Sequence, residues 1–298
     1  MAELIPLGLT LLAFAGYGTG LHVLRRRGVR WPAGRVWCGL AGAFCVAVAS
    51  LPPVASHDGV FTVHVAQHLL LGMVAPGFLA MSAPLTLALR ALPVRPRRLL
   101  LRLLHSLPAK GLAAPGTAVA LNLGGLYVLY LTGVYRATEH NDLLHAAVHL
   151  HMFLAGCLLS WVVIGVDPMR RPGTPVRLAV LAVTAAGHDT LAKFLYAWNL
   201  PTAGGALAVR HAGAELLYYG GTVTEMTLAV IVMAQWYLAT SRALDRNRHQ
   251  AAAPGSEAGN QTGRPKRPSP PSTTFTSRPL PGGSLPANDA PSSWHRTP

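Results

Sequence analysis

Two pairs of histidines with the same spacing are the residues of this sequence whose types could most readily do chemistry. His64 and His68 are four residues apart, and His145 and His149 repeat that spacing further along the chain. Residues four apart lie on one face of an α-helix, so each pair can direct two imidazoles at one point. Imidazole is the commonest metal ligand among side chains. The pattern predicts a metal site with up to four nitrogen ligands if the two helices are neighbours.

The residues beside these pairs indicate which metal would suit the site. Met152 follows His149 by three residues and so lies on the same helical face, and Met73 lies near His68. Thioether sulfur beside imidazole favours Cu(I) over hard cations such as Mg²⁺. Gln67 and His151 adjoin the two pairs, and we expect both to support the ligands. Copper is therefore the predicted ion.

A second group of polar residues lies deeper in an apolar segment. His188, Asp189 and Lys193 fall within residues 175–198. A charge in a membrane helix is costly and is usually either paired or functional. Asp189 and Lys193 are four apart and could neutralise each other. Asp189 could instead orient His188 by accepting a hydrogen bond, but adjacent residues point about 100° apart on a helix. Glu225, on the next apolar segment, is therefore the expected acceptor.

Further alternatives for these histidines remain open. His211 begins the last apolar segment and, with His188, completes the predicted metal-ligand set. A haem with two imidazole ligands would also need one histidine from each of two facing helices. The pairs crowd one end of their segments, which suits one ion or one haem better than two stacked haems. Histidines near a membrane surface can also simply hydrogen-bond between helices or to lipid headgroups.

The segments that carry these residues have the composition of membrane spans. Hydrophobic residues make up 51% of the chain and charged residues only 12%, against about a quarter charged in soluble domains. The predicted fold is an all-α integral membrane protein, a bundle of seven transmembrane helices. Pro76 and Pro84 are expected to kink the third span. The predicted spans are 4–24, 36–54, 61–89, 114–135, 143–166, 175–198 and 211–239.

The basic residues are distributed unevenly between the loops. The loops at 25–35, 90–110 and 167–177 hold 14 lysines and arginines, whereas the loops on the opposite side hold only Arg136 and Arg210. Basic loops stay in the cytoplasm, so the N-terminus and both histidine pairs are predicted to lie outside and the C-terminus inside. The arginines lack interleaved aromatic residues, and no nucleic acid is expected as a partner. Residues 1–240 form the predicted membrane domain, and 241–298 a disordered cytoplasmic tail rich in Pro, Ser and Arg.

Short motifs follow one another along these spans in a fixed order. They are HVAQH at 64–68, AP at 75–76, SAP at 82–84, LLHAAVH at 143–149, FLAG at 153–156 and IGVDP at 164–168. In this combination residues 1–240 resemble the caa3-type CtaG family of cytochrome c oxidase assembly proteins. The resemblance implies a multi-pass protein of the bacterial plasma membrane that helps to mature a haem–copper oxidase, through copper handling. It also implies that the two histidine pairs are the residues to carry over.

The functional expectation is a copper-binding assembly factor whose partners are oxidase subunits and the lipid bilayer. No nucleophile–base pair, phosphate-binding loop or nucleotide fingerprint is present in the sequence, so an enzyme is not expected. A copper transporter is one alternative, but it needs ligands that continue to the cytoplasmic side, where three cysteines and scattered methionines are available. A haem-binding membrane redox protein is the other alternative.

Overall fold

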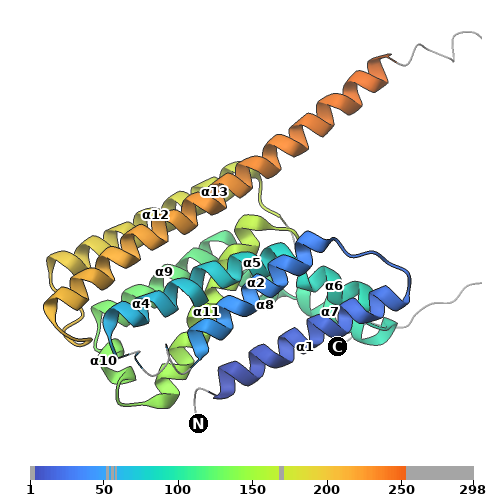
Figure 1. Cartoon of the computed structure of the whole chain (residues 1–298). Coiled ribbons are helices and arrows are strands. Elements are labelled where there is room, and N and C mark those ends of the chain that lie inside the picture. The colour runs from blue at the N-terminus through green and yellow to red at the C-terminus, as the bar shows by residue number, and fades with distance from the viewer. Residues whose placement is uncertain (1–3, 52–53, 55–56, 58, 168–170, 253–298) are drawn as a thin grey trace, which may run out of the picture. The chain divides into compact units, whose positions relative to one another are not determined.

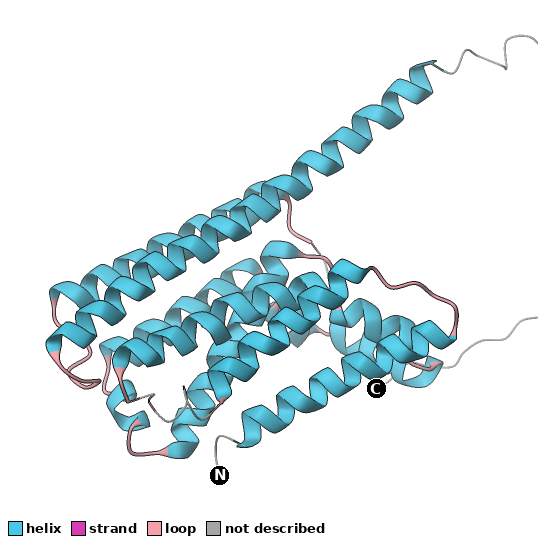
Figure 2. Cartoon of the chain, viewed as in Figure 1, coloured by secondary structure: helices cyan, strands magenta, loops and turns pink. Residues whose placement is uncertain are grey.

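The structure is a computed structural model that describes residues 4–51, 54, 57, 59–167 and 171–252 (Figures 1 and 2). The described residues form helices and loops and no strand. Residues 1–246 form one compact unit. The helices of the described residues are α1 (Leu4–Arg26), α2 (Ala33–Ser50), α4 (Phe61–Leu69), the π-helix η1 (Leu70–Val74), α5 (Ala75–Ser82), α6 (Pro84–Ala91), α7 (Val94–Leu104), α8 (Leu107–Leu112), α9 (Pro115–Leu131), α10 (Val134–Thr138), α11 (Asp142–Ile164), α12 (Thr174–Ala197) and α13 (Leu207–Ala252).

Five stretches of helix are long and apolar enough to cross a membrane. Within the described residues they are Ala33–Ser50, Phe61–Ala91, Asp142–Ile164, Thr174–Ala197 and Leu207–Arg248. Helix α9 is equally apolar but has only 17 residues. The all-helical, multi-pass membrane architecture is therefore confirmed. The seven-span count and the orientation of the two ends stay predictions.

The third predicted span is interrupted at both of its prolines, as expected. Pro76 has no N–H to donate to the carbonyl of Gly72, and the helix widens into the π-helix η1 just before it. At Pro84 the helix restarts, because Ala83 takes the left-handed conformation with φ 54° and ends α5. The span thus consists of α4, η1 and α5 in one continuous run followed by α6, and α4 carries His64 and His68.

Asp167 holds α6 against the end of α11. Its Oδ1 accepts hydrogen bonds from the backbone N of Thr86 at 2.8 Å and from Thr86 Oγ1 at 2.6 Å. Its Oδ2 accepts from Leu85 N at 3.4 Å and from Trp161 Nε1 at 3.2 Å. A carboxylate at a helix N-terminus satisfies free N–H groups and complements the helix dipole. Asp167 thereby caps α6 from another segment of the chain.

Helix α11 packs against η1, α5 and α9, and glycine allows the closest of these approaches. A Cβ added at Gly156 would overlap the carbonyl oxygen of Gly72 and would lie 3.0 Å from Pro76 Cγ. Small residues are common where membrane helices approach closely. The free carbonyl that Pro76 leaves on Gly72 is therefore covered by α11, which fixes α11 beside the histidine-bearing part of the third span.

Helix α13 continues further than predicted. The predicted tail begins at residue 241, but α13 runs to Ala252. Residues 241–252 contain three alanines and three arginines and no proline, so a helix can continue in them beyond the apolar span. The prediction of disorder for residues 253–298 lies outside the described residues.

Candidate functional site

Three of the four paired histidines come together where α4 and α11 meet. The ring centroids of His64 and His149 are 5.6 Å apart, and those of His145 and His149 are 4.4 Å apart. His64 is buried, with 1% of its surface exposed, whereas His145 and His149 are half-buried. The helices that carry the two pairs are thus neighbours at this point, which is the condition that the spacing argument required.

Two tyrosines that the sequence interpretation did not single out enclose His64. The ring of Tyr135 lies 5.0 Å from that of His64 and the ring of Tyr130 lies 5.9 Å from it, both edge-on. Phe61 packs against both tyrosines and extends this aromatic wall. Depth in the membrane could have identified these tyrosines. The span 114–135 ends with them on the side of the membrane where the third span begins, near His64.

His68 faces a different neighbour from His64. Its ring centroid lies 6.4 Å from that of His188 on α12. Beneath the ring lies Gly72 of the π-helix, where an added Cβ would be 3.0 Å from His68 Cε1. His68 is 2% exposed, and among the described residues neither of its ring nitrogens has a hydrogen-bond partner. Unsatisfied polar atoms of this kind are uncommon in folded proteins.

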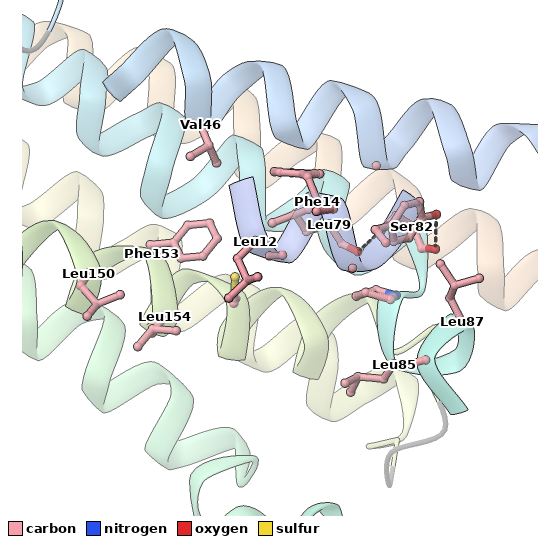
Figure 3. A pocket seen from close by; sticks show the side chains of 18 of the residues that line it. Leu12, Phe14, Val46, Leu79, Ser82, Leu85, Leu87, Leu150, Phe153 and Leu154 are labelled. Carbon is pink, nitrogen blue, oxygen red and sulfur yellow. Dashed lines mark hydrogen bonds between the residues drawn. The ribbon is translucent and has the colours of Figure 1, made fainter. Parts of the chain in front are cut away.

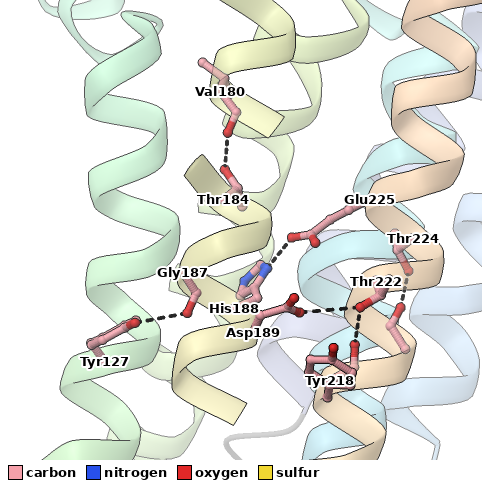
Figure 4. Close-up of polar contacts among 11 residues, drawn as sticks. Tyr127, Val180, Thr184, Gly187, His188, Asp189, Tyr218, Thr222, Thr224 and Glu225 are labelled. Atoms are coloured by element: carbon pink, nitrogen blue, oxygen red, sulfur yellow. Dashed lines mark hydrogen bonds and ion pairs between the residues drawn. The ribbon is translucent and has the colours of Figure 1, made fainter. Parts of the chain in front are cut away.

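His188 is held by a buried carboxylate, as expected from its position on α12 (Figure 4). Its Nδ1 lies 2.6 Å from Glu225 Oε1 on α13, and the two side chains are 1% and 5% exposed. With a carboxylate as the acceptor, Nδ1 carries the proton and the lone pair resides on Nε2. No described group hydrogen-bonds to that Nε2.

The neighbouring charged residues of α12 have contacts of their own. Asp189 Oδ1 accepts a hydrogen bond from Thr222 Oγ1 at 3.4 Å (Figure 4). The Lys193 ammonium lies 5.1 Å from the centre of the Tyr218 ring, within the range of a cation–π interaction. Both partners belong to α13, so these side chains join α12 to α13 rather than turning toward His188.

His151 and His211 are placed away from the other histidines. His151 lies on the opposite face of α11, because two residues correspond to about 200° of helical rotation. Its Nε2 is 3.2 Å from the carbonyl oxygen of Leu121 on α9. His211 is bonded to Asn199 Oδ1 at 2.7 Å and stacks on Tyr196 with ring centroids 4.2 Å apart.

Gln67 and the two methionines support the helices around the histidines. The Nε2 of Gln67 donates to the carbonyl of Ala49 at 3.0 Å, which joins α4 to α2. Met73 and Met152 are buried in one apolar core together with Val65 and Leu69. No group of three or more His, Cys, Asp or Glu side chains within the described part of the chain is arranged to hold a metal ion. The arrangement thus provides pairs of imidazoles.

An apolar cavity of about 1540 Å³, part of whose lining is drawn in Figure 3, borders the half-buried histidines. Its walls come from α1, α2, α5, α6 and α11, and Val46, Leu79, Leu87 and Phe153 are among the residues that line it. His145 and His149 also line it, together with Gln67 and Asp142. His145 and His149 therefore border this cavity, although the Nε2 of His149 is itself buried, whereas His64, His68 and His188 do not line it.

Comparison with known proteins gives one family match and several relatives. Residues 15–239 match the family model for the cytochrome c oxidase caa3 assembly factor (Caa3_CtaG). Uncharacterized proteins of Mycobacterium bovis and Mycobacterium tuberculosis are each 32% identical over 259 residues, which cover 78% of this chain and 39% of the relative. One of Mycobacterium leprae is 30% identical over 242 residues, 74% of this chain and 37% of the relative. The chain thus spans about two fifths of the length of these relatives. No solved structure gives a significant match.

Proposed function

We propose that this chain, which belongs to the family of cytochrome c oxidase caa3 assembly factors, supports the metal loading of a haem–copper oxidase by binding copper at its histidines. The ligands are His64, His68, His145 and His149, joined by His188. The observation that carries the proposal is the 5.6 Å separation of the His64 and His149 rings, because it joins residues 85 positions apart on two membrane helices. In this proposal the protein binds copper as cargo and transfers it to the oxidase.

The chemistry of these side chains suits Cu(I). Imidazole binds copper well, and thioether sulfur selects the reduced ion. Met73 and Met152 lie in the core that adjoins His68. Cu(I) is stable with only two or three ligands, so pairs of imidazoles are sufficient. A carrier also needs to release its ion, and a site with few ligands exchanges more readily than a closed four-ligand site.

The surroundings of the histidines fit a delivery role on the outer face of the plasma membrane. The distribution of basic loops favours the outside for the histidine end. His145 and His149 line the apolar cavity, through which a membrane-embedded subunit of the oxidase can approach them. The role proposed for the protein is binding and transfer, without catalysis of a reaction.

A strain without this protein tests the proposal most simply. We expect its caa3-type oxidase to be inserted in the membrane but to contain less copper and to lose most of its activity, while the wild-type gene restores both. Copper per oxidase polypeptide is measured by mass spectrometry of the metal after purification of the oxidase. An oxidase with its normal copper content in the deletion strain would contradict the proposal. Complete absence of the oxidase polypeptides at every copper concentration would support an assembly role without copper.

A further inference from the structure

We propose that His68 and His188 form an inner, two-coordinate site for Cu(I), separate from an outer site in which His149 pairs with His64 or His145. This inference rests on the proposed function and deepens it, since it divides the histidines into two sites of different access. The inner pair comes from α4 and α12, and the outer group from α4 and α11.

The spacing of the inner pair matches two imidazoles on opposite sides of one ion. A metal–nitrogen bond is about 2 Å long, and the ligating nitrogen lies about 1 Å from the ring centre, so the two ring centres should be about 6 Å apart. The centroids of His68 and His188 are 6.4 Å apart. Linear coordination by two nitrogens is favourable for Cu(I) and unfavourable for Zn²⁺, which takes four ligands. The geometry therefore selects a soft monovalent ion.

The nitrogens that an ion would need are the ones that the protein leaves without partners. Both ring nitrogens of His68 and the Nε2 of His188 have no hydrogen bond to any described residue, and both side chains are at least 98% buried. Burying such an atom without a partner is unfavourable, because the atom loses its hydrogen bonds to water. A bound ion would satisfy one nitrogen of each ring. A bound ligand would offset the unfavourable burial of two unsatisfied histidines side by side.

Glu225 completes the inner site without touching the ion. It accepts the hydrogen bond from His188 Nδ1 at 2.6 Å, which directs the lone pair to Nε2 and raises the basicity of the imidazole. Its carboxylate also offsets the charge of a monovalent cation in an apolar core. Glu225 is thus a positioning residue, and the ligands are His68 and His188.

The two sites differ in access, which gives an order of transfer. His145 and His149 line the cavity, whereas His68 and His188 are enclosed, with Gly72 in contact with the His68 ring. On the outer side, His64 lies one helical turn from His68 on α4, and its ring centroid is 5.6 Å from that of His149. An ion therefore reaches the inner site through the outer one. The inner site holds copper, and the outer site exchanges it.

Anaerobic Cu(I) titration of the full-length protein in lipid nanodiscs, in competition with a chromophoric Cu(I) chelator, tests this division. We expect two equivalents for the wild type and one equivalent for His188→Leu. The double variant His145→Ala/His149→Ala should also bind one, and its X-ray absorption spectrum should show two nitrogen ligands. Glu225→Gln should keep two equivalents but bind the inner one at least tenfold more weakly. His105→Ala, at an exposed histidine between α7 and α8, is the control and should match the wild type.

The possible results separate failure of the inner site from failure of the proposed function. Two equivalents of equal affinity in wild type, His188→Leu and Glu225→Gln would overturn the inner site and leave copper binding intact. Loss of all copper in His145→Ala/His149→Ala would show one shared site and would overturn the division. No copper in the wild type would overturn both proposals. If His188→Leu does not yield folded protein, His188→Gln replaces it, because its amide retains a donor for Glu225 and lacks the imidazole.

Discussion

Replacing Gly156 by alanine is expected to prevent most of the protein from accumulating in a folded form. The new Cβ would overlap the carbonyl oxygen of Gly72, which is backbone and cannot turn away as a side chain could. Overpacking of this kind costs about 3 kcal/mol or more. Helix α11 would have to move away from η1, and His149 would move away from His64 with it. The yield of monodisperse protein and its midpoint of thermal denaturation measure the effect.

The matched control for Gly156→Ala is Gly124→Ala. Gly124 also lies within a helix, α9, but a Cβ added there has no heavy atom within 4 Å. Because alanine is favoured over glycine within helices by about 1 kcal/mol, the control should keep or slightly raise the midpoint. Equal midpoints for the two variants would mean that α11 does not rest on the Gly72 carbonyl, and the account of how the third span and α11 are joined would be wrong.

Replacing both His64 and His68 by alanine is expected to reduce oxidase activity in cells to the level of the deletion strain. The change removes one ligand from the outer site and one from the inner site. Loss of a residue that only orients a ligand already lowers metal affinity about 10- to 100-fold, so loss of two ligands should abolish copper binding at cellular concentrations. Oxidase activity of isolated membranes, divided by the amount of oxidase polypeptide, measures the effect.

The control for this experiment is the replacement of other histidines in the same chain. His151→Ala and His105→Ala remove imidazoles that contact the Leu121 and Leu101 carbonyls. Both variants should retain at least half of the wild-type oxidase activity. A double variant His64→Ala/His68→Ala that is present at normal levels in the membrane and supports full oxidase activity would exclude these histidines from the function.

The membrane architecture and the central contacts were predictable from local patterns. Long apolar segments and few charges indicate membrane helices because backbone polar groups must be satisfied internally in lipid. The meeting of His64 with His149 followed from their equal depth. Glu225 was expected as the hydrogen-bond acceptor of His188, because Asp189, the next residue on the same helix, points about 100° away. Each of these predictions depended on helical geometry together with depth in the membrane.

Other features depended on packing between helices, which the sequence does not specify. His64 and His68 share one face in the sequence pattern, yet a separation of four residues turns the side chain by about 40° and moves it one helical turn along the axis. His64 therefore meets α11, whereas His68 meets α12. The sequence predicts His211 as a ligand and His151 as a support of the ligands, but rotation about α11 and the loop before α13 place them elsewhere.

Metal analysis of the purified protein, combined with its visible absorption spectrum, tests the central claim most directly. We expect copper in the wild-type protein, no Soret band, and at least a fivefold lower copper content in the His64→Ala/His68→Ala variant. A Soret band that the variant lacks would identify haem as the ligand and contradict the copper site. Equal copper in both proteins would show that these two histidines do not bind it.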